Sequence, residues 1–137
     1  MNLDASAFVA DQELIWALRE RATAVDCDHD RVLFHQGDEP SGLYILHQGE
    51  VIMTMESLTG DEVLSIAAVP GSLLGLPGLV GNMGYSLSAF AKKGAEISFV
   101  SRDDFSSLML SEPKLAMMIL RVLANEVRTA RLAITGK

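Results

Sequence analysis

The chain has 137 residues, of which 49% are hydrophobic, and a formal net charge of −7. This length suits one domain with a hydrophobic core and is short for two. Prolines and glycines interrupt the longest uncharged stretch, residues 63–91, which excludes a membrane-spanning helix there. With no signal-like segment at the start, we expect a cytoplasmic protein without a membrane partner. The single cysteine, Cys27, excludes an intramolecular disulfide.

The charge is distributed unevenly along the chain. Residues 1–62 carry 13 acidic and 3 basic side chains, whereas residues 113–137 carry 1 acidic and 5 basic ones. An acidic body repels phosphate backbones, so nucleic-acid binding by this chain alone is not expected. The basic residues near the end lie on one predicted helix, where a solvated face explains them.

The first predicted element is a helix. Ser6 or Asp11 could cap it, and it should end near Arg21. Its apolar positions follow helical spacing at Phe8, Leu14, Ile15, Trp16 and Leu18. We therefore expect this helix to pack on the body of the domain.

Short strands with turns between them follow. The predicted strands are residues 24–25, 31–34, 43–46, 51–55, 63–69 and 95–101, separated by turns rich in Gly, Asp and Pro. This spacing is typical of a β-sandwich, a barrel or a jelly roll.

Residues 69–91 are rich in glycine among apolar side chains. Such a stretch is typical either of a surface loop or of a pocket wall, because glycines let backbone N–H groups approach a ligand. It closes with the alternating run of residues 85–90.

The end of the chain is predicted to be helical, with one helix over residues 101–110 and a longer one from Pro113 to about Ile134. The long helix has two apolar stripes. One has coiled-coil spacing and consists of Ala116, Leu120, Leu123, Val127, Ala130 and Ile134. The adjacent stripe is Leu115, Met118, Ile119 and Val122. We expect the second stripe to face the β body and the first to form the seam of a homodimer; the alternative is one wide core-facing stripe in a monomer.

Three motifs in order resemble the cyclic nucleotide-binding-like domain of catabolite-activator (Crp-Fnr) type regulators. They are residues 33–38 with 42–46 and 49–51, then Pro70-Gly71 with Gly75, and finally residues 101–105 with 113–116 and 126–128. The resemblance implies a single domain that is mainly β with flanking helices. Its parts would be an N-terminal helix (1–22), a β-roll or jelly roll (23–101) with a pocket loop (71–87) holding a short helix, and C-terminal helices (102–137) that include the dimerisation helix.

The pocket loop departs from the family pattern. By resemblance, cyclic nucleotide-binding members place a glutamate for the ribose and an arginine for the cyclic phosphate at positions that are Leu76 and Tyr85 here. Losing a charge-assisted pair to phosphate costs a large part of the affinity. The pocket residues implied by family position are Gly75, Leu76, Pro77, Gly78, Tyr85, Ser86 and Leu87. We therefore expect no usual binding of cAMP or cGMP, no other cofactor, and a neutral or mostly apolar ligand if there is one.

Regulators of this family continue into a helix-turn-helix domain, whereas this sequence stops at Lys137. The sequence therefore predicts a cytoplasmic regulatory or sensor module that acts through a partner protein. The alternative is the sensor half of a Crp-Fnr-type transcription regulator whose DNA-binding domain is absent from this chain.

A rival interpretation is a cupin-like metal enzyme, since related-looking jelly rolls bind metals. Metal sites of that kind need two or three histidines that converge with a carboxylate, often as H-x-H. His29, His35 and His47 lack that spacing, and no Ser-His-acid or Cys-His pairing is indicated. We expect neither a catalytic nor a metal site.

Overall fold

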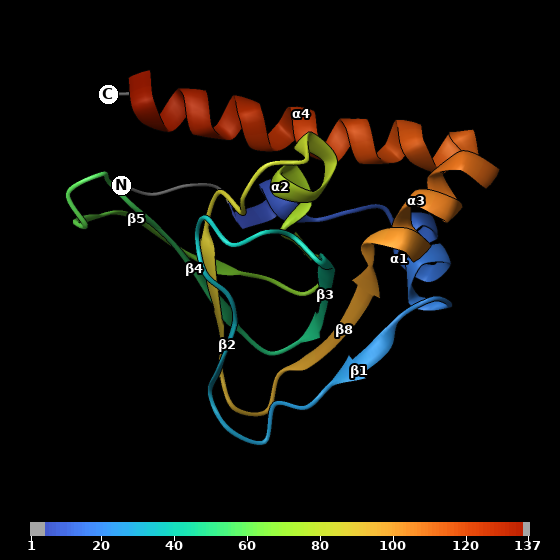
Figure 1. Cartoon of the computed structure of the whole chain (residues 1–137), viewed down its shortest axis with the longest axis horizontal. Coiled ribbons are helices and arrows are strands. Elements are labelled where there is room, and N and C mark those ends of the chain that lie inside the picture. Colours follow the sequence, from blue (N-terminus) through green and yellow to red (C-terminus); the bar gives the residue numbers. More distant parts are fainter. Residues whose placement is uncertain (1–4, 136–137) are drawn as a thin grey trace.

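The structure is a computed structural model that describes residues 5–135, with side chains described for residues 5–128. The described residues form eight strands in two antiparallel four-stranded sheets, flanked by helices (Figure 1). The predicted class, mainly β with flanking helices, is confirmed.

The two sheets interleave along the chain. The strands are β1 (Thr23–Val25), β2 (Arg31–Phe34), β3 (Gly42–Gln48), β4 (Val51–Glu56), β5 (Glu62–Ala68), β6 (Leu73–Leu74), β7 (Ser88–Ala91) and β8 (Glu96–Ser101). One sheet has the order β1-β8-β3-β6 and the other the order β2-β7-β4-β5. Non-consecutive strands are neighbours in both sheets, as expected for a roll rather than a simple meander.

The glycine-rich stretch contains more regular structure than its composition indicates. Leu73 and Leu74 form β6, which pairs with β3 opposite Tyr44 and Ile45, and both leucines are fully buried. The helix α2 (Leu76–Gly81) follows, as the resemblance implied, and β7 closes the stretch. A strand of two residues has no periodicity of its own, so the sequence alone could not reveal β6.

The N-terminal helix begins after Asp11, the later of the two predicted caps, and is shorter than the implied range of residues 1–22. A 3-10 turn, η1 (Ala5–Phe8), is separated from the helix α1 (Gln12–Arg19), and Asp11 occupies the N-cap position of α1 without a side-chain capping bond. Leu14 and Leu18 are buried as expected. Trp16, which was named among the apolar positions at helical spacing, is 65% exposed and does not share this buried face.

Two helices end the chain. The helix α3 (Arg102–Ser111) is capped by Ser101, whose hydroxyl accepts a hydrogen bond from the backbone N–H of Asp104 at 3.2 Å. Pro113 opens α4 (Pro113–Thr135), which lies across the body beside α2 (Figure 1). The stripe that was predicted to face the core is buried, namely Leu115, Met118, Ile119 and Val122.

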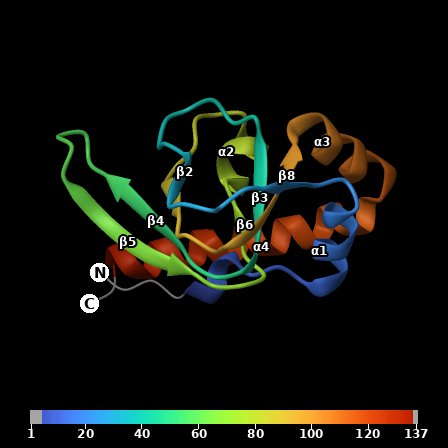
Figure 2. The same ribbon diagram turned by 90° about the horizontal axis from the view of Figure 1, so that it is seen from below.

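The apolar side chains form two cores. The first lies between the sheets and includes Phe34, Leu46 and Met53. The second joins β3 and β8 to all four α-helices and includes Leu14, Leu76 and Ile119. Figure 2 shows α1 and α3 at one end of the molecule and the hairpin of β4 and β5 at the other. Among the described residues, no helix is long and apolar enough to cross a membrane.

Candidate functional site

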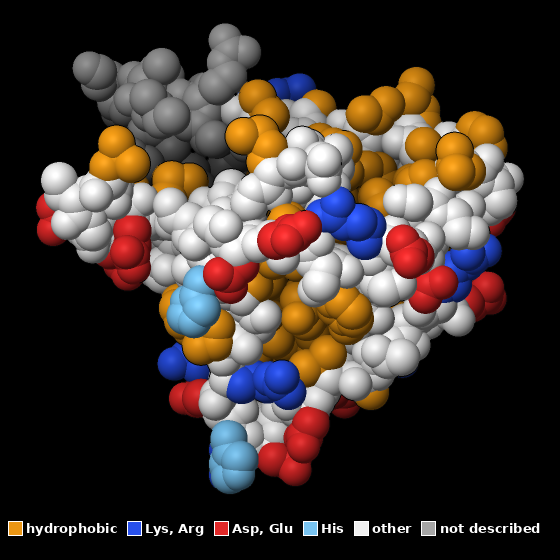
Figure 3. All heavy atoms as spheres, in the orientation of Figure 1, with side chains coloured by type: hydrophobic (Ala, Val, Ile, Leu, Met, Phe, Trp, Pro, Cys, Tyr) orange, Lys and Arg blue, Asp and Glu red, His pale blue; other side chains and the backbone are white. Residues whose placement is uncertain are grey.

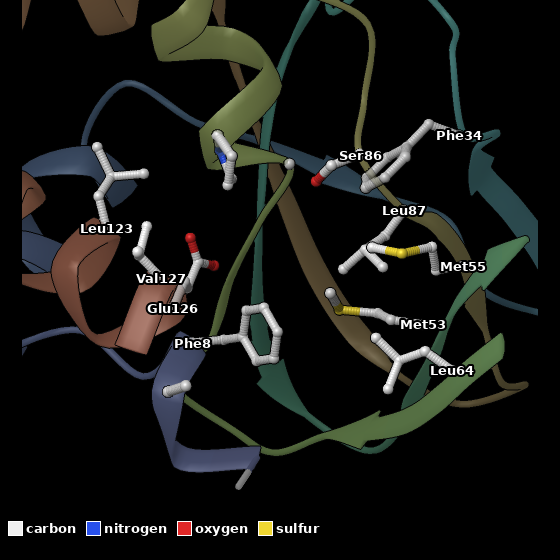
Figure 4. A pocket seen from close by; sticks show the side chains of 13 residues that line it. Phe8, Phe34, Met53, Met55, Leu64, Ser86, Leu87, Leu123, Glu126 and Val127 are labelled. Carbon is white, nitrogen blue, oxygen red and sulfur yellow. The ribbon is translucent and has the colours of Figure 1, made fainter. Parts of the chain in front are cut away.

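A cavity of about 260 Å³ lies between the β4–β5 hairpin and α4. Figure 4 shows side chains from α4 on one side of it and from β4 and β5 on the other. Its lining consists of Ala7, Phe8, Phe34, Met53, Met55, Leu64, Gly75, Pro77, Ser86, Leu87, Leu123, Glu126 and Val127. This lining is almost entirely apolar, which favours a ligand with an apolar body.

The turn after β2 holds the end of the pocket loop in place. The backbone N–H of Gly37 donates to the carbonyl of Tyr85 at 2.8 Å, and the N–H of Tyr85 donates to the carbonyl of Asp38 at 3.0 Å. These reciprocal bonds fix residue 85 against the turn that contains the first family motif.

Tyr85 itself is part of the core. Its ring stacks on Phe34 with the ring centroids 3.9 Å apart, and its hydroxyl donates to the carbonyl of Gly42 at 2.7 Å. Gly75 permits this packing, because its φ is +93° and a Cβ there would lie 2.7 Å from the Tyr85 ring. Residue 85, where the resemblance implied an arginine in nucleotide-binding members, therefore holds a buried, hydrogen-bonded phenol.

Apart from Tyr85, the family-derived pocket positions divide into two groups. Gly75, Pro77, Ser86 and Leu87 line the cavity. Leu76 is fully buried in the second core, and a Cβ on Gly78 would meet the backbone of Gly84 and Tyr85, so these side-chain positions face away from the cavity.

Other polar residues of the loop are engaged elsewhere. The guanidinium of Arg102 donates to the side-chain oxygen of Asn82 at 2.7 Å and to the carbonyl of Pro40 at 2.6 Å. The Ser88 hydroxyl accepts from the backbone N–H of Gln36 at 2.8 Å. The first two bonds join Asn82 of the pocket loop and Pro40 to α3, and the third joins β7 to the turn after β2. Ser86 is the loop hydroxyl that lines the cavity.

Several lining residues were missed by the sequence analysis. Met53 and Met55 lie on the same face of β4, two residues apart, and Phe8 comes from η1. Leu64 on β5 and Glu126 on α4 also lie outside the pocket loop. The alternation of side chains along β4 predicts that Met53 and Met55 share one face of the strand. No local pattern shows which other elements cover that face.

Glu126 is the one charged side chain among the described residues that line the cavity. Its Oε2 atom is buried and has no hydrogen-bond partner among the described residues. Burial raises the pKa of this carboxyl to about 8, because an unpartnered charge is poorly solvated there. No Lys, Arg, His or Asp lines the described cavity to neutralise it.

The predicted seam of α4 is placed in part by the structure. Leu120 and Val127 are each 57% exposed, whereas Ala116 and Leu123 are half-buried. Leu123 and Val127 also line the cavity, so the seam adjoins the candidate site. Ala130 and Ile134 lie outside the residues whose side chains are described. Figure 3 shows hydrophobic side chains along the edge where α3 and α4 run.

The described residues contain no group of three or more His, Cys, Asp or Glu side chains placed to hold a metal ion. The Nε2 atom of His47 is instead 2.7 Å from the Ser98 hydroxyl, within the sheet of β3 and β8. Cys27 is buried in the first core.

Comparison with known proteins identifies the family. The profile of the cyclic nucleotide-binding domain matches residues 25–112. The chain therefore belongs to the cyclic nucleotide-binding domain family.

Curated relatives are regulators. The chain is 35% identical over 102 residues to the anaerobic regulatory protein of Aggregatibacter actinomycetemcomitans, a match that covers 72% of the chain and 38% of the relative. It is 31% identical to the cyclic AMP receptor protein of Thermus thermophilus, covering 73% of the chain and 46% of the relative. The chain thus spans less than half the length of these relatives.

A solved structure shows the same fold. The crystal structure of the Thermus thermophilus catabolite activator protein superposes with a TM-score of 0.78 at 26% identity. The superposition covers 90% of this chain and 58% of that one.

Proposed function

We propose that the chain is a cytoplasmic sensor module of the Crp-Fnr type whose cavity takes a small, mostly apolar molecule in place of a cyclic nucleotide. The observation that carries this proposal is the cavity lining, which is apolar and has no basic side chain among the described residues. A cyclic phosphate would lose its hydration there without gaining a cationic partner, and Glu126 would oppose it if ionised.

Occupancy of the cavity has a direct route to α4. A ligand would contact Met53 and Met55 on β4 and also Leu123 and Val127 on α4. Because Val127 belongs to the exposed stripe, a change in its position would alter the surface available to a second copy. We propose that the module acts as a homodimer through α4 and that the dimer transmits the signal.

We propose that the module passes its signal to the DNA-binding part of a regulator. Its curated relatives are named as regulators, and the net charge of −7 disfavours binding of DNA by residues 1–137 themselves. We propose that DNA is contacted by a helix-turn-helix domain outside these residues, in a longer chain or in a partner protein. Fluorescence anisotropy with labelled DNA should show no specific binding by this chain; specific binding would overturn this assignment.

Calorimetric titration with cAMP and with cGMP tests the ligand assignment. We expect no binding with a Kd below about 10 μM, which corresponds to about −7 kcal/mol. Tighter binding of either nucleotide would show that the cavity is an ordinary cyclic nucleotide site.

A further inference from the structure

Glu126 distinguishes this cavity from a simple apolar hole, because its side chain is half-buried and its Oε2 atom is fully buried. It extends from α4 toward the space that faces Phe8 and Met53 (Figure 4), and its Oε2 atom has no partner among the described residues. Buried acceptors without a partner are uncommon because each one costs the free energy of its lost hydration. Such an atom indicates a place where a ligand can supply the missing hydrogen bond.

We propose that the cavity binds a small molecule with an apolar body and one amino group, and that the Glu126 carboxylate pairs with this group. The proposal rests on the proposed function, because it names the ligand class of the same cavity. Phe8, Met53, Met55 and Leu64 would contact the apolar body. The Ser86 hydroxyl is the other polar side chain in the lining.

The charges in and around the cavity favour an amine over other polar groups. An ammonium ion gains a charge-assisted hydrogen bond from a carboxylate, which is about twice as strong as a neutral one. A carboxylate or phosphate on the ligand would find no cationic partner in the described lining. The net charge of −7 also raises the local concentration of cations and lowers that of anions.

The volume limits the size of the ligand. At about 260 Å³ the cavity lies slightly below the range of roughly 300–1,000 Å³ that is usual for ligand pockets. A single ring or a short branched chain with one amino group fits this space better than a nucleotide does. Because the pKa of Glu126 is raised by burial, the free carboxyl is largely protonated at neutral pH, and pairing with an ammonium ion should release a proton.

Methyl NMR on the full chain tests the proposal with probes that differ in one group. Phenethylamine, phenethyl alcohol and phenylacetate share an aromatic body, and ¹³C-methyl methionine labels report where each one binds. Met53 and Met55 line the cavity, whereas Met117 is exposed on α4 and serves as an internal control. We expect millimolar phenethylamine to shift the Met53 and Met55 signals and to leave Met117 unchanged, with weaker shifts from the alcohol and the weakest from phenylacetate.

The variant Glu126→Gln isolates the carboxyl, since the amide has nearly the same shape. It should weaken phenethylamine binding by at least about tenfold and leave the affinity for phenethyl alcohol nearly unchanged. Calorimetry of the amine in two buffers of different ionisation enthalpy should show proton release with the unaltered chain and none with the variant. Leu110→Glu, on the exposed face of α3, is a control that should change neither result.

Two outcomes would overturn the inference and separate it from the proposed function. If the alcohol binds and the amine binds equally well or more weakly, the apolar-ligand function stands and the amine inference is wrong. Loss of dimer in Glu126→Gln with unchanged amine binding would show that the carboxyl pairs with the second copy. If none of the three probes shifts Met53 or Met55, both the inference and the apolar-ligand function are wrong.

Discussion

Tyr85 stands where the resemblance implied a ligand position, and the structure places it in the first core. The Tyr85 ring stacks on Phe34, and its hydroxyl donates to the Gly42 carbonyl at 2.7 Å. An arginine could not make both contacts as a neutral, buried side chain. The phenol does both, because its ring is apolar and its single donor is satisfied. Leu76→Glu and Tyr85→Arg would each place a charged side chain at a position that is buried in one of the two cores.

Removing the Tyr85 hydroxyl should lower stability. We expect Tyr85→Phe to reduce the free energy of unfolding by about 1–2 kcal/mol. The variant loses the buried hydrogen bond from the hydroxyl, and the Gly42 carbonyl loses this donor. The matched control is Tyr44→Phe, whose hydroxyl makes a longer bond of 3.3 Å to the Leu33 carbonyl and should matter less. Urea denaturation measures both changes; an equal or larger loss in Tyr44→Phe would contradict this ranking.

Glu126 should make stability depend on pH. Burial raises its pKa from 4.5 to about 8. Between these values the unfolded chain binds fewer protons than the folded one, so the free energy of unfolding should fall as the pH rises, by at most about 1.4 kcal/mol per pH unit. The contribution is most favourable below the unfolded pKa and is lost by the time the pH passes the folded pKa.

The variant Glu126→Gln should remove this slope and be more stable than the unaltered chain at pH values above neutral. Thermal unfolding across the pH range measures it, with Glu112→Gln, at the exposed end of α3, as the control. A slope that survives in Glu126→Gln would assign the pH dependence to another group.

At the scale of elements, α2 depends on the backbone conformation of Gly75. The φ of +93° disfavours any L side chain, and a Cβ would lie 2.7 Å from the Tyr85 ring. Gly75→Ala should therefore cost about 1–3 kcal/mol of stability. Gly81→Ala in the same helix has open space around its Cβ and should be nearly neutral or stabilising. Equal effects in the two variants, measured by thermal unfolding, would contradict this reading of α2.

The predicted seam of α4 is the surface that we expect to form the dimer interface. Leu120 is the better probe of it, because Leu123 and Val127 also line the cavity. Leu120→Glu should place two carboxylates at an apolar interface and shift the protein to monomers, while Leu110→Glu on α3 should leave the dimer intact. Sedimentation velocity distinguishes the two states. A monomer for the unaltered chain at tens of micromolar would refute the seam.

The sequence predicted the elements better than the site. Turn residues and alternation located β2 to β5 and β8, and the two stripes of α4 indicated which face is buried. The two-residue strand β6 forms because it pairs with β3, which is distant in the sequence. The exposure of Trp16 likewise depends on what packs around α1, and no local sequence pattern reveals this. Glu126 reads as a surface acid on a basic helix, and its burial follows only from the placement of η1 and the β4–β5 hairpin against α4.

At the scale of the whole molecule, the cavity joins the β-roll to the helix that carries the seam. Its lining includes residues from η1, β2, β4, β5, the pocket loop and α4, so occupancy can bias the position of α4 relative to the roll. A sensor of this design needs a ligand that contacts both sides. An apolar body reaching from Met53 to Leu123 meets that requirement without any phosphate contact.

The most direct test of this account is a competition in one methyl NMR spectrum of the full chain. Cyclic AMP and cyclic GMP are added at millimolar concentration, followed by phenethyl alcohol, and the Met53 and Met55 signals are followed throughout. We predict that these signals stay in place with either nucleotide and shift with the apolar probe. Nucleotide-induced shifts at Met53 and Met55 that phenethyl alcohol cannot reverse would contradict the central claim that this cavity accepts an apolar molecule in place of a cyclic nucleotide.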